Sequence, residues 1–172
     1  MREDLDIPLG PGLLRKWACM LYEGLLVFGV VFVAALVFGL ATQTRNALEN
    51  RTGLQAFIFL VLAAYFTWFW SKGQTLAMKT WHVHLTMPNG APVPQARALL
   101  RYFLAWVGIF PPSAVAYFTQ ISATSLFVGT VLWLMAWTAI SQFRADRQLM
   151  HDVWAGTILT YAPPASREAK RS

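Results

Sequence analysis

Long uninterrupted apolar blocks are the feature of this sequence that most limits how the chain can fold. The first block covers residues 18–41 and contains Tyr22 and Glu23 as its main polar side chains. A helix of that length extends about 36 Å, which exceeds the roughly 30 Å hydrocarbon core of a bilayer. Because the apolar residues are contiguous and not amphipathically spaced, we expect lipid to cover them.

Three further blocks predict three more membrane-spanning helices. They cover residues 54–70, 99–118 and 121–140. The first of these ends in Tyr65, Trp68 and Trp70, aromatic residues that are typical of the headgroup level. The next contains Pro111 and Pro112, which lack backbone donors, so we expect that helix to kink or break there. The short connection before residue 121 predicts that the last two helices form a hairpin.

The composition agrees with a membrane protein. Only 13% of the residues are charged, whereas a soluble domain has about 25%. The net charge is +6, but no run of five like charges occurs, which argues against a nucleic-acid partner. The single Cys19 excludes an intramolecular disulfide and a cysteine-based metal cluster.

Lysine and arginine are distributed unevenly among the predicted loops. Only Arg45 and Arg51 fall on one side. The other side carries Arg2, Arg15, Lys16, Lys72, Lys79, Arg97, Arg101, Arg144, Arg147, Arg167, Lys170 and Arg171. The positive-inside rule therefore predicts that both termini are cytosolic. Residues 1–14 then form a flexible cytosolic lead-in, and residues 163–172 form a basic tail.

Between the second and third blocks the pattern changes to strand-like alternation. Residues 80–87 alternate, and Asn89-Gly90 follows, which is a strong hairpin signal. The sequence therefore predicts a small cytosolic β-hairpin over residues 80–94. The apolar element at residues 153–162 is too short to span. It is either a further strand of this sheet or an interfacial helix.

Motifs for catalysis and metal binding do not occur in the sequence. His82 and His84 would share one face of the predicted strand, but no third ligand follows at suitable spacing, so we interpret them as solvated polar residues. Phosphate-binding glycine loops, nucleophile elbows and metalloprotease helices are missing as well. We therefore expect no enzymatic activity of its own, no cofactor and no metal.

Ionisable residues in or beside the apolar blocks are the candidate functional residues. Glu23 lies inside the first span, where a charge near the bilayer centre costs on the order of 2.5–3.5 kcal/mol and less toward the interface. Arg15 precedes Glu23 by eight positions, about 80° around the helix, so the two side chains cannot pair directly. Arg101 begins the third span. His151 and Asp152 offer a carboxylate at the depth of Arg15.

The sequence resembles the RDD family of bacterial membrane proteins. The segments that carry the resemblance are Arg15, Glu23, residues 73–76 (Gly-Gln-Thr-Leu), 98–102 (Ala-Leu-Leu-Arg-Tyr), 147–152 and 155–157. The family is named for one arginine and two aspartates, which by position are Arg15, Glu23 and Asp152. Glu23 departs from the family aspartate by one methylene, and residues 77–79 depart from the usual glycine-lysine. The resemblance implies one membrane domain, residues 15–162, in the bacterial inner membrane.

Two functions fit these residues, and a third would need a partner. The family implies transport of an unknown ligand, including cation/proton exchange, in which Glu23 and Asp152 bind the proton or cation and Arg15 tunes them. We favour a structural clasp in which Arg15 bridges both acids, because an unpaired buried charge costs several kcal/mol. The protein is then a structural, assembly or partner-binding subunit that contacts lipid and a second copy or another membrane protein. The remaining alternative is an enzyme whose catalytic groups come from a partner.

Overall fold

The computed structural model describes residues 10–43, 50–119, 122–144 and 146–161. Within these ranges the chain is mostly helical, and the predicted tail at residues 163–172 lies outside them. The long helices are α1 (Leu13–Thr42), α2 (Arg51–Ser71), α4 (Gln95–Thr119) and α5 (Ala123–Ile140). The short elements are α3 (Leu76–Thr80), β1 (Val83–Thr86), η1 (Ser141–Phe143), α6 (Met150–Ala155) and β2 (Ile158–Tyr161). Most of the predicted lead-in, residues 1–9, also falls outside the described residues.

Three of the described stretches are long and apolar enough to cross a membrane. They are Leu13–Thr42, Arg51–Thr80 and Ala123–Phe143. They correspond to the first, second and fourth predicted blocks, and they indicate a membrane protein. The third block lies in α4, whose 25 residues include Arg97, Arg101 and two prolines, so its composition is less apolar than that of the other three.

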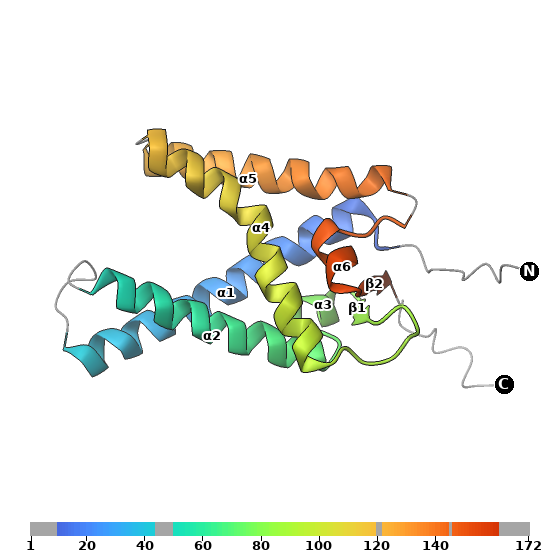
Figure 1. The fold of residues 1–172 in the computed structure, drawn as a ribbon, viewed down its shortest axis with the longest axis horizontal. Helices are drawn as coiled ribbons and strands as arrows, with labels where there is room; N and C mark the ends of the chain where they lie inside the picture. Colours follow the sequence, from blue (N-terminus) through green and yellow to red (C-terminus); the bar gives the residue numbers. More distant parts are fainter. Residues whose placement is uncertain (1–9, 44–49, 120–121, 145, 162–172) are drawn as a thin grey trace, which may run out of the picture.

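Helix α4 continues through Pro111 and Pro112 without a break, so of the two predicted outcomes the broken helix is wrong. Figure 1 shows the helix changing direction along its length. Pro112 has no N–H to donate to the carbonyl of Gly108, four residues earlier. The indole Nε1 of Trp133 on α5 donates to that carbonyl instead, at 2.7 Å. A side chain of the neighbouring helix therefore replaces one hydrogen bond that proline removes.

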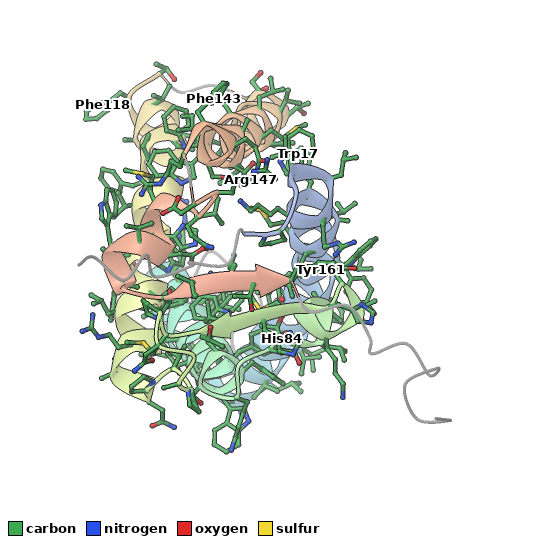
Figure 2. The ribbon with its side chains drawn as sticks, turned by 90° about the vertical axis from the view of Figure 1, so that its right-hand side faces the viewer. Trp17, His84, Phe118, Phe143, Arg147 and Tyr161 are labelled. Atoms are coloured by element: carbon green, nitrogen blue, oxygen red, sulfur yellow. The ribbon has the colours of Figure 1, made fainter. Side chains whose placement is uncertain are left out.

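The long helices spread from one end of the molecule (Figure 1). Helices α3 and α6 and the two strands lie at that end, whereas the end of α1 and the start of α2 lie at the other. Figure 2 looks onto the first end and shows the strands crossing in front of the helices. The start of α1 and the end of β2 meet there, since the Arg15 guanidinium lies 3.5 Å above the Tyr161 ring.

The sheet has two antiparallel strands that come from distant parts of the chain. Val83 lies opposite Tyr161, and Thr86 lies opposite Ile158. This register confirms the alternative in which the stretch near residue 160 pairs with the first predicted strand. Gly156, with a φ of 66°, ends α6 before β2 begins. In its described part, residues 153–161, the predicted apolar element contains the end of α6 and all of β2, so it is neither a single strand nor a single helix.

The predicted hairpin over residues 80–94 is wrong in its second half. A turn does form, because Gly90 N–H donates to the Met87 carbonyl at 2.9 Å. Residues 91–94 are not a strand, and Pro92 and Pro94 have no N–H with which to continue a ladder. His82 lies before β1 with a φ of 56°, so it does not share a strand face with His84.

The buried core lies at the sheet end of the molecule and not along the long helices. Its most buried apolar side chains are Trp70, Ala77, Val83, Leu85, Val93, Ala98, Tyr102, Leu149, Ala155 and Leu159. On α1 and α5, by contrast, Phe28, Leu40 and Phe127 are exposed. This distribution suits helices that face lipid and a small packed cap at one end of them.

Candidate functional site

An ion pair between Arg101 on α4 and Asp152 on α6 lies at the centre of the cap. Arg101 Nε donates to Asp152 Oδ1 at 2.6 Å, and the two side chains are 4% and 0% exposed. The Arg101 guanidinium also lies 4.0 Å above the Trp70 ring, a cation–π arrangement. Asp152 Oδ2 has no hydrogen-bond partner among the described residues. The carboxylate therefore depends on Arg101 for its compensation.

The backbone around Asp152 is fixed by β2 and its neighbours. The Asp152 carbonyl accepts hydrogen bonds from Thr157, from the backbone N–H at 2.9 Å and from the hydroxyl at 3.2 Å. Gln148 donates through Nε2 to the Leu159 carbonyl and accepts from the Leu159 N–H, at 2.9 and 2.8 Å. The Gln148 amide thus acts as one more strand residue along β2. The orientation of Asp152 is set by these contacts.

His151 lies beside the ion pair. Its Nε2 is 3.4 Å from Asp152 Oδ1, and its side chain is 16% exposed. Burial lowers the pKa of His151 to about 4, which the Asp152 carboxylate only partly opposes. At neutral pH the imidazole is therefore uncharged, and Arg101 supplies the positive charge of this group.

Lys16 on α1 provides a second buried cation. It is 3% exposed. Its Nζ donates to Ser141 Oγ at 2.9 Å and also to the Arg147 carbonyl. The neighbouring Trp17 donates through Nε1 to Thr138 Oγ1 at 2.7 Å. These bonds hold the start of α1 to α5, η1 and the segment before α6.

Arg15 does not make the predicted bridge between Glu23 and Asp152. Among the described residues it forms an ion pair with neither acid, and it stacks on Tyr161 instead. Successive helix residues are about 100° apart, so Lys16 faces the interior while Arg15 faces outward. The structure therefore corrects the predicted clasp: the arginine that pairs with Asp152 is Arg101.

Glu23 belongs to a separate group of contacts. Its Oε1 accepts from the Tyr65 hydroxyl at 2.9 Å, and its Oε2 accepts from the Thr75 hydroxyl. Thr75 also caps α3 by accepting from the Met78 N–H. No cation pairs with Glu23 in the part of the chain that the structure describes. Glu23 therefore joins α1 to α2 and α3 as a hydrogen-bond acceptor.

The sequence reasoning missed Lys16, Tyr65, Thr75 and Gln148 as members of this network. A signal for Lys16 was available, because Lys16 and Glu23 are seven residues apart and so lie on one helix face, two turns from each other. The other three have only long-range contacts, for which no local pattern exists.

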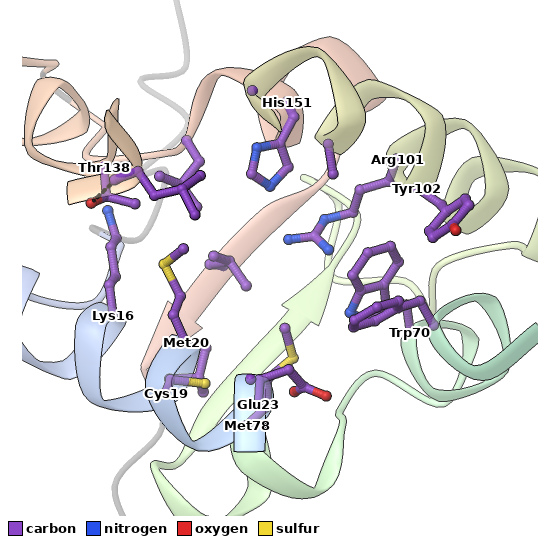
Figure 3. A pocket seen from close by; sticks show the side chains of 18 of the residues that line it. Lys16, Cys19, Met20, Glu23, Trp70, Met78, Arg101, Tyr102, Thr138 and His151 are labelled. Carbon is purple, nitrogen blue, oxygen red and sulfur yellow. Dashed lines mark hydrogen bonds between the residues drawn. The ribbon is translucent and has the colours of Figure 1, made fainter. Parts of the chain in front are cut away.

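A cavity of about 380 Å³ opens beside these groups. Its wall is mainly apolar, and its lining includes the charged or titratable side chains of Lys16, Cys19, Glu23, Arg101, Tyr102 and His151. Figure 3 shows these side chains around the open space. Within the described ranges no three His, Cys, Asp or Glu side chains group in a way that could hold a metal ion. The cavity therefore combines an apolar wall with a few charged side chains on separate sides of it (Figure 3).

The chain was compared with known families and proteins. A family model described as RDD family matches residues 10–156, which is most of the 172 residues. Neither a curated protein nor a solved structure matches the chain.

Proposed function

The chain belongs to the RDD family, and on that premise we propose that it is a non-enzymatic subunit whose Arg101–Asp152 pair is a structural clasp. The observation that carries the proposal is the complete burial of Asp152 in an existing pair. A carboxylate with no exposure and a cation at 2.6 Å is poorly placed to bind and release a ligand from solution. Its role is to hold α6 and β2 against α4.

The clasp has a charge-exchange test. Arg101→Asp and Asp152→Arg each leave two like charges buried together, so each single variant is expected to lose folded protein from the membrane fraction. The double variant restores opposite charges and is expected to recover part of that loss. A double variant no better than the single variants would contradict the clasp.

We propose that α4 is a fourth span and that both termini are cytosolic, in the bacterial inner membrane. The proposal is supported by the position of the buried Lys16 and Arg101 and the exposed Arg147 at the end with the sheet, whereas Arg51 begins α2 at the other end. In a Cys19→Ser background, an impermeant maleimide should label Arg51→Cys in intact cells. It should label Asn89→Cys only after the membrane is opened. The reverse pattern would overturn the orientation.

The subunit role itself needs a partner, and we propose a second copy or another membrane protein that packs on the exposed helix faces. The support is the extent of exposed apolar surface on α1 and α5. Crosslinking in the native membrane is the test. A chain recovered only as an uncrosslinked monomer would contradict this role.

Glu23 supports a second candidate, cation/proton exchange. It is a carboxylate on a candidate span, it lines the cavity, and none of the described cations pairs with it. Cells that lack their own antiporters should then tolerate more sodium when they make the protein, and Glu23→Gln should abolish this gain. Asp152→Asn, which leaves the buried Arg101 without its counter-charge, is expected to lower the tolerance only in proportion to the amount of protein left in the membrane. No gain by the wild-type chain, with the protein confirmed in the membrane, would reject exchange.

A further inference from the structure

Residues 10–12, with the sequence Gly-Pro-Gly, form an N-terminal strap that packs on the segment before α6. The Gly10 N–H donates to the Asp146 carbonyl at 3.2 Å, and Gly12 directly precedes α1. Gly10 and Pro11 are buried, whereas Gly12 is exposed. The start of the described chain is therefore fixed to its C-terminal part at the sheet end of the molecule.

The strap is part of the cavity wall. Pro11 lines the cavity, and its side chain is fully buried. Every other lining residue except Leu149 belongs to a helix or a strand. Leu149 is held by the start of α6, because its carbonyl accepts the N–H groups of Asp152 and Val153. By contrast, a single hydrogen bond, from Gly10, joins the strap to the C-terminal part of the described chain. A segment with so few hydrogen bonds opens more readily than the helices and strands around it.

The strap lies against the carbonyl that also holds Lys16. A Cβ placed on Gly10 would be only 2.8 Å from the Arg147 carbonyl oxygen, so this close approach requires glycine. The Lys16 ammonium donates to the same carbonyl. The strap and the first turn of α1 therefore meet at one backbone group.

From Lys16 onward, one face of α1 follows the cavity. Lys16, Cys19 and Glu23 are spaced by three and four residues, so they share a helix face. All three line the cavity, and Figure 3 shows them in this order along one wall. The strap therefore lies at the sheet end of a row of side chains that leads to Glu23.

We propose that the strap is a gate at the sheet end of the cavity. When the strap lifts from Arg147, the cavity opens to water at this end, and when the strap is seated, the cavity is closed there. If Glu23 exchanges cations, the gate controls access to Glu23 from this side, and only that consequence rests on the proposed function.

Cys19 is the single cysteine of the chain, and it can report the state of the gate. It is 8% exposed and lines the cavity. The full chain is reconstituted in lipid nanodiscs, in which lipid covers the long helices and both water-facing ends are accessible. The rate at which a charged maleimide labels Cys19 then follows the population of the open form.

Gly10→Ala and Gly12→Ala form a matched pair, because each adds one methyl group to the strap. At Gly10 the added Cβ meets the Arg147 carbonyl, whereas at Gly12 it meets no atom within 4 Å. Gly10→Ala is expected to raise the labelling rate about tenfold. Gly12→Ala is expected to label at the wild-type rate.

Pro11→Gly opens the gate without a steric clash, because it makes the strap more flexible and removes a side chain from the wall. It is also expected to label several-fold faster than the wild-type chain. Global unfolding would expose Cys19 as well, so the comparison is made between variants whose melting temperatures match that of the wild-type chain.

Wild-type labelling rates in the folded Gly10→Ala or Pro11→Gly chains would overturn the gate. An equal acceleration in Gly12→Ala would also overturn it, because the contact with Arg147 would then not control opening. Faster labelling in Gly10→Ala and Pro11→Gly, without a gain in sodium tolerance by the wild-type chain, would support the gate and reject exchange at Glu23.

Discussion

Arg101 and Asp152 are 51 positions apart in the sequence, yet their side chains form a 2.6 Å ion pair at the centre of the cap. One partner belongs to a long helix and the other to a helix of six residues. The pair is therefore a direct link between the long helix α4 and the last described segment of the chain.

Removing one member of the pair should cost more than removing both. Asp152→Ala leaves the Arg101 charge buried without a partner, which costs about 3–5 kcal/mol. Replacing both together, as Arg101→Met with Asp152→Leu, removes both desolvation penalties and should be much milder. Thermal unfolding of the detergent-purified chains measures the difference. A double variant as unstable as Asp152→Ala would show that the pair is not the main reason for the loss.

Gln148 should be necessary for the order of β2. Gln148→Leu leaves the N–H and carbonyl of Leu159 without their side-chain partner, and each unsatisfied buried group costs about 1–3 kcal/mol. Faster hydrogen exchange at the Leu159 amide is the expected result. Gln95→Leu, at an exposed position on α4, is the control and should leave that amide protected. Unchanged exchange in Gln148→Leu would refute this role.

The stability of the cap should fall as the solution becomes acidic. The folded pKa of His151 is about 4, below its ordinary value of about 6.5, so the unfolded chain binds the proton more readily. Stability is therefore full above pH 6.5 and decreases between pH 6.5 and pH 4, by about 3 kcal/mol at most. The Arg144 hydrogen bond lowers the pKa of Asp146. The contribution of Asp146 to stability is therefore lost only below the pH range in which His151 titrates. The melting temperature of the His151→Gln variant should stay constant between pH 6.5 and pH 4. A decrease equal to that of the wild-type chain would contradict the assignment of this pH dependence to His151.

Replacing Trp133 should reduce the stability of the chain more when Pro112 is present than when it is replaced. Trp133→Phe leaves the Gly108 carbonyl without its donor, at a cost of about 1–3 kcal/mol. Pro112→Ala restores an N–H that can bond that carbonyl, so Trp133→Phe should cost less in this background. The free energy of unfolding in detergent is measured for the wild-type chain, the two single variants and the double variant, which together form a double-mutant cycle. Trp154→Phe, at an exposed position, is the control, and purely additive losses would refute the compensation.

The elements that the sequence predicts well are those with a local signal. The contiguous apolar runs locate α1, α2 and α5, and the Asn89-Gly90 pair locates a turn. The pairing of β1 with the stretch near residue 160 is only one of two alternatives at the sequence level, because strand pairing depends on contacts between distant residues. Pro92 and Pro94 explain why the predicted hairpin does not form. They prevent residues 91–94 from continuing a ladder with β1, which is then free to pair with β2.

The sequence predicts several residues of the candidate site but not which of them contact one another. Glu23, Arg101, His151 and Asp152 do line the cavity or adjoin it. The prediction that Arg15 bridges the two acids was wrong, and it is Lys16 that faces the interior, because one residue changes the direction of a helical side chain by about 100°. The phase of α1 is set by its packing on α2, α3 and α5, which the sequence alone does not state.

The pairing of β1 with β2 also sets an order of events during synthesis. Strand β1 leaves the ribosome about seventy residues before its partner, so its edge, the Arg101 guanidinium and the cavity all stay open while α4 and α5 are made. Non-local pairing of this kind comes late in folding. Closure of the cap therefore follows the synthesis of β2. A nascent chain stalled before Ile158 is expected to expose an edge strand and the otherwise buried Arg101, which quality-control proteases can recognise.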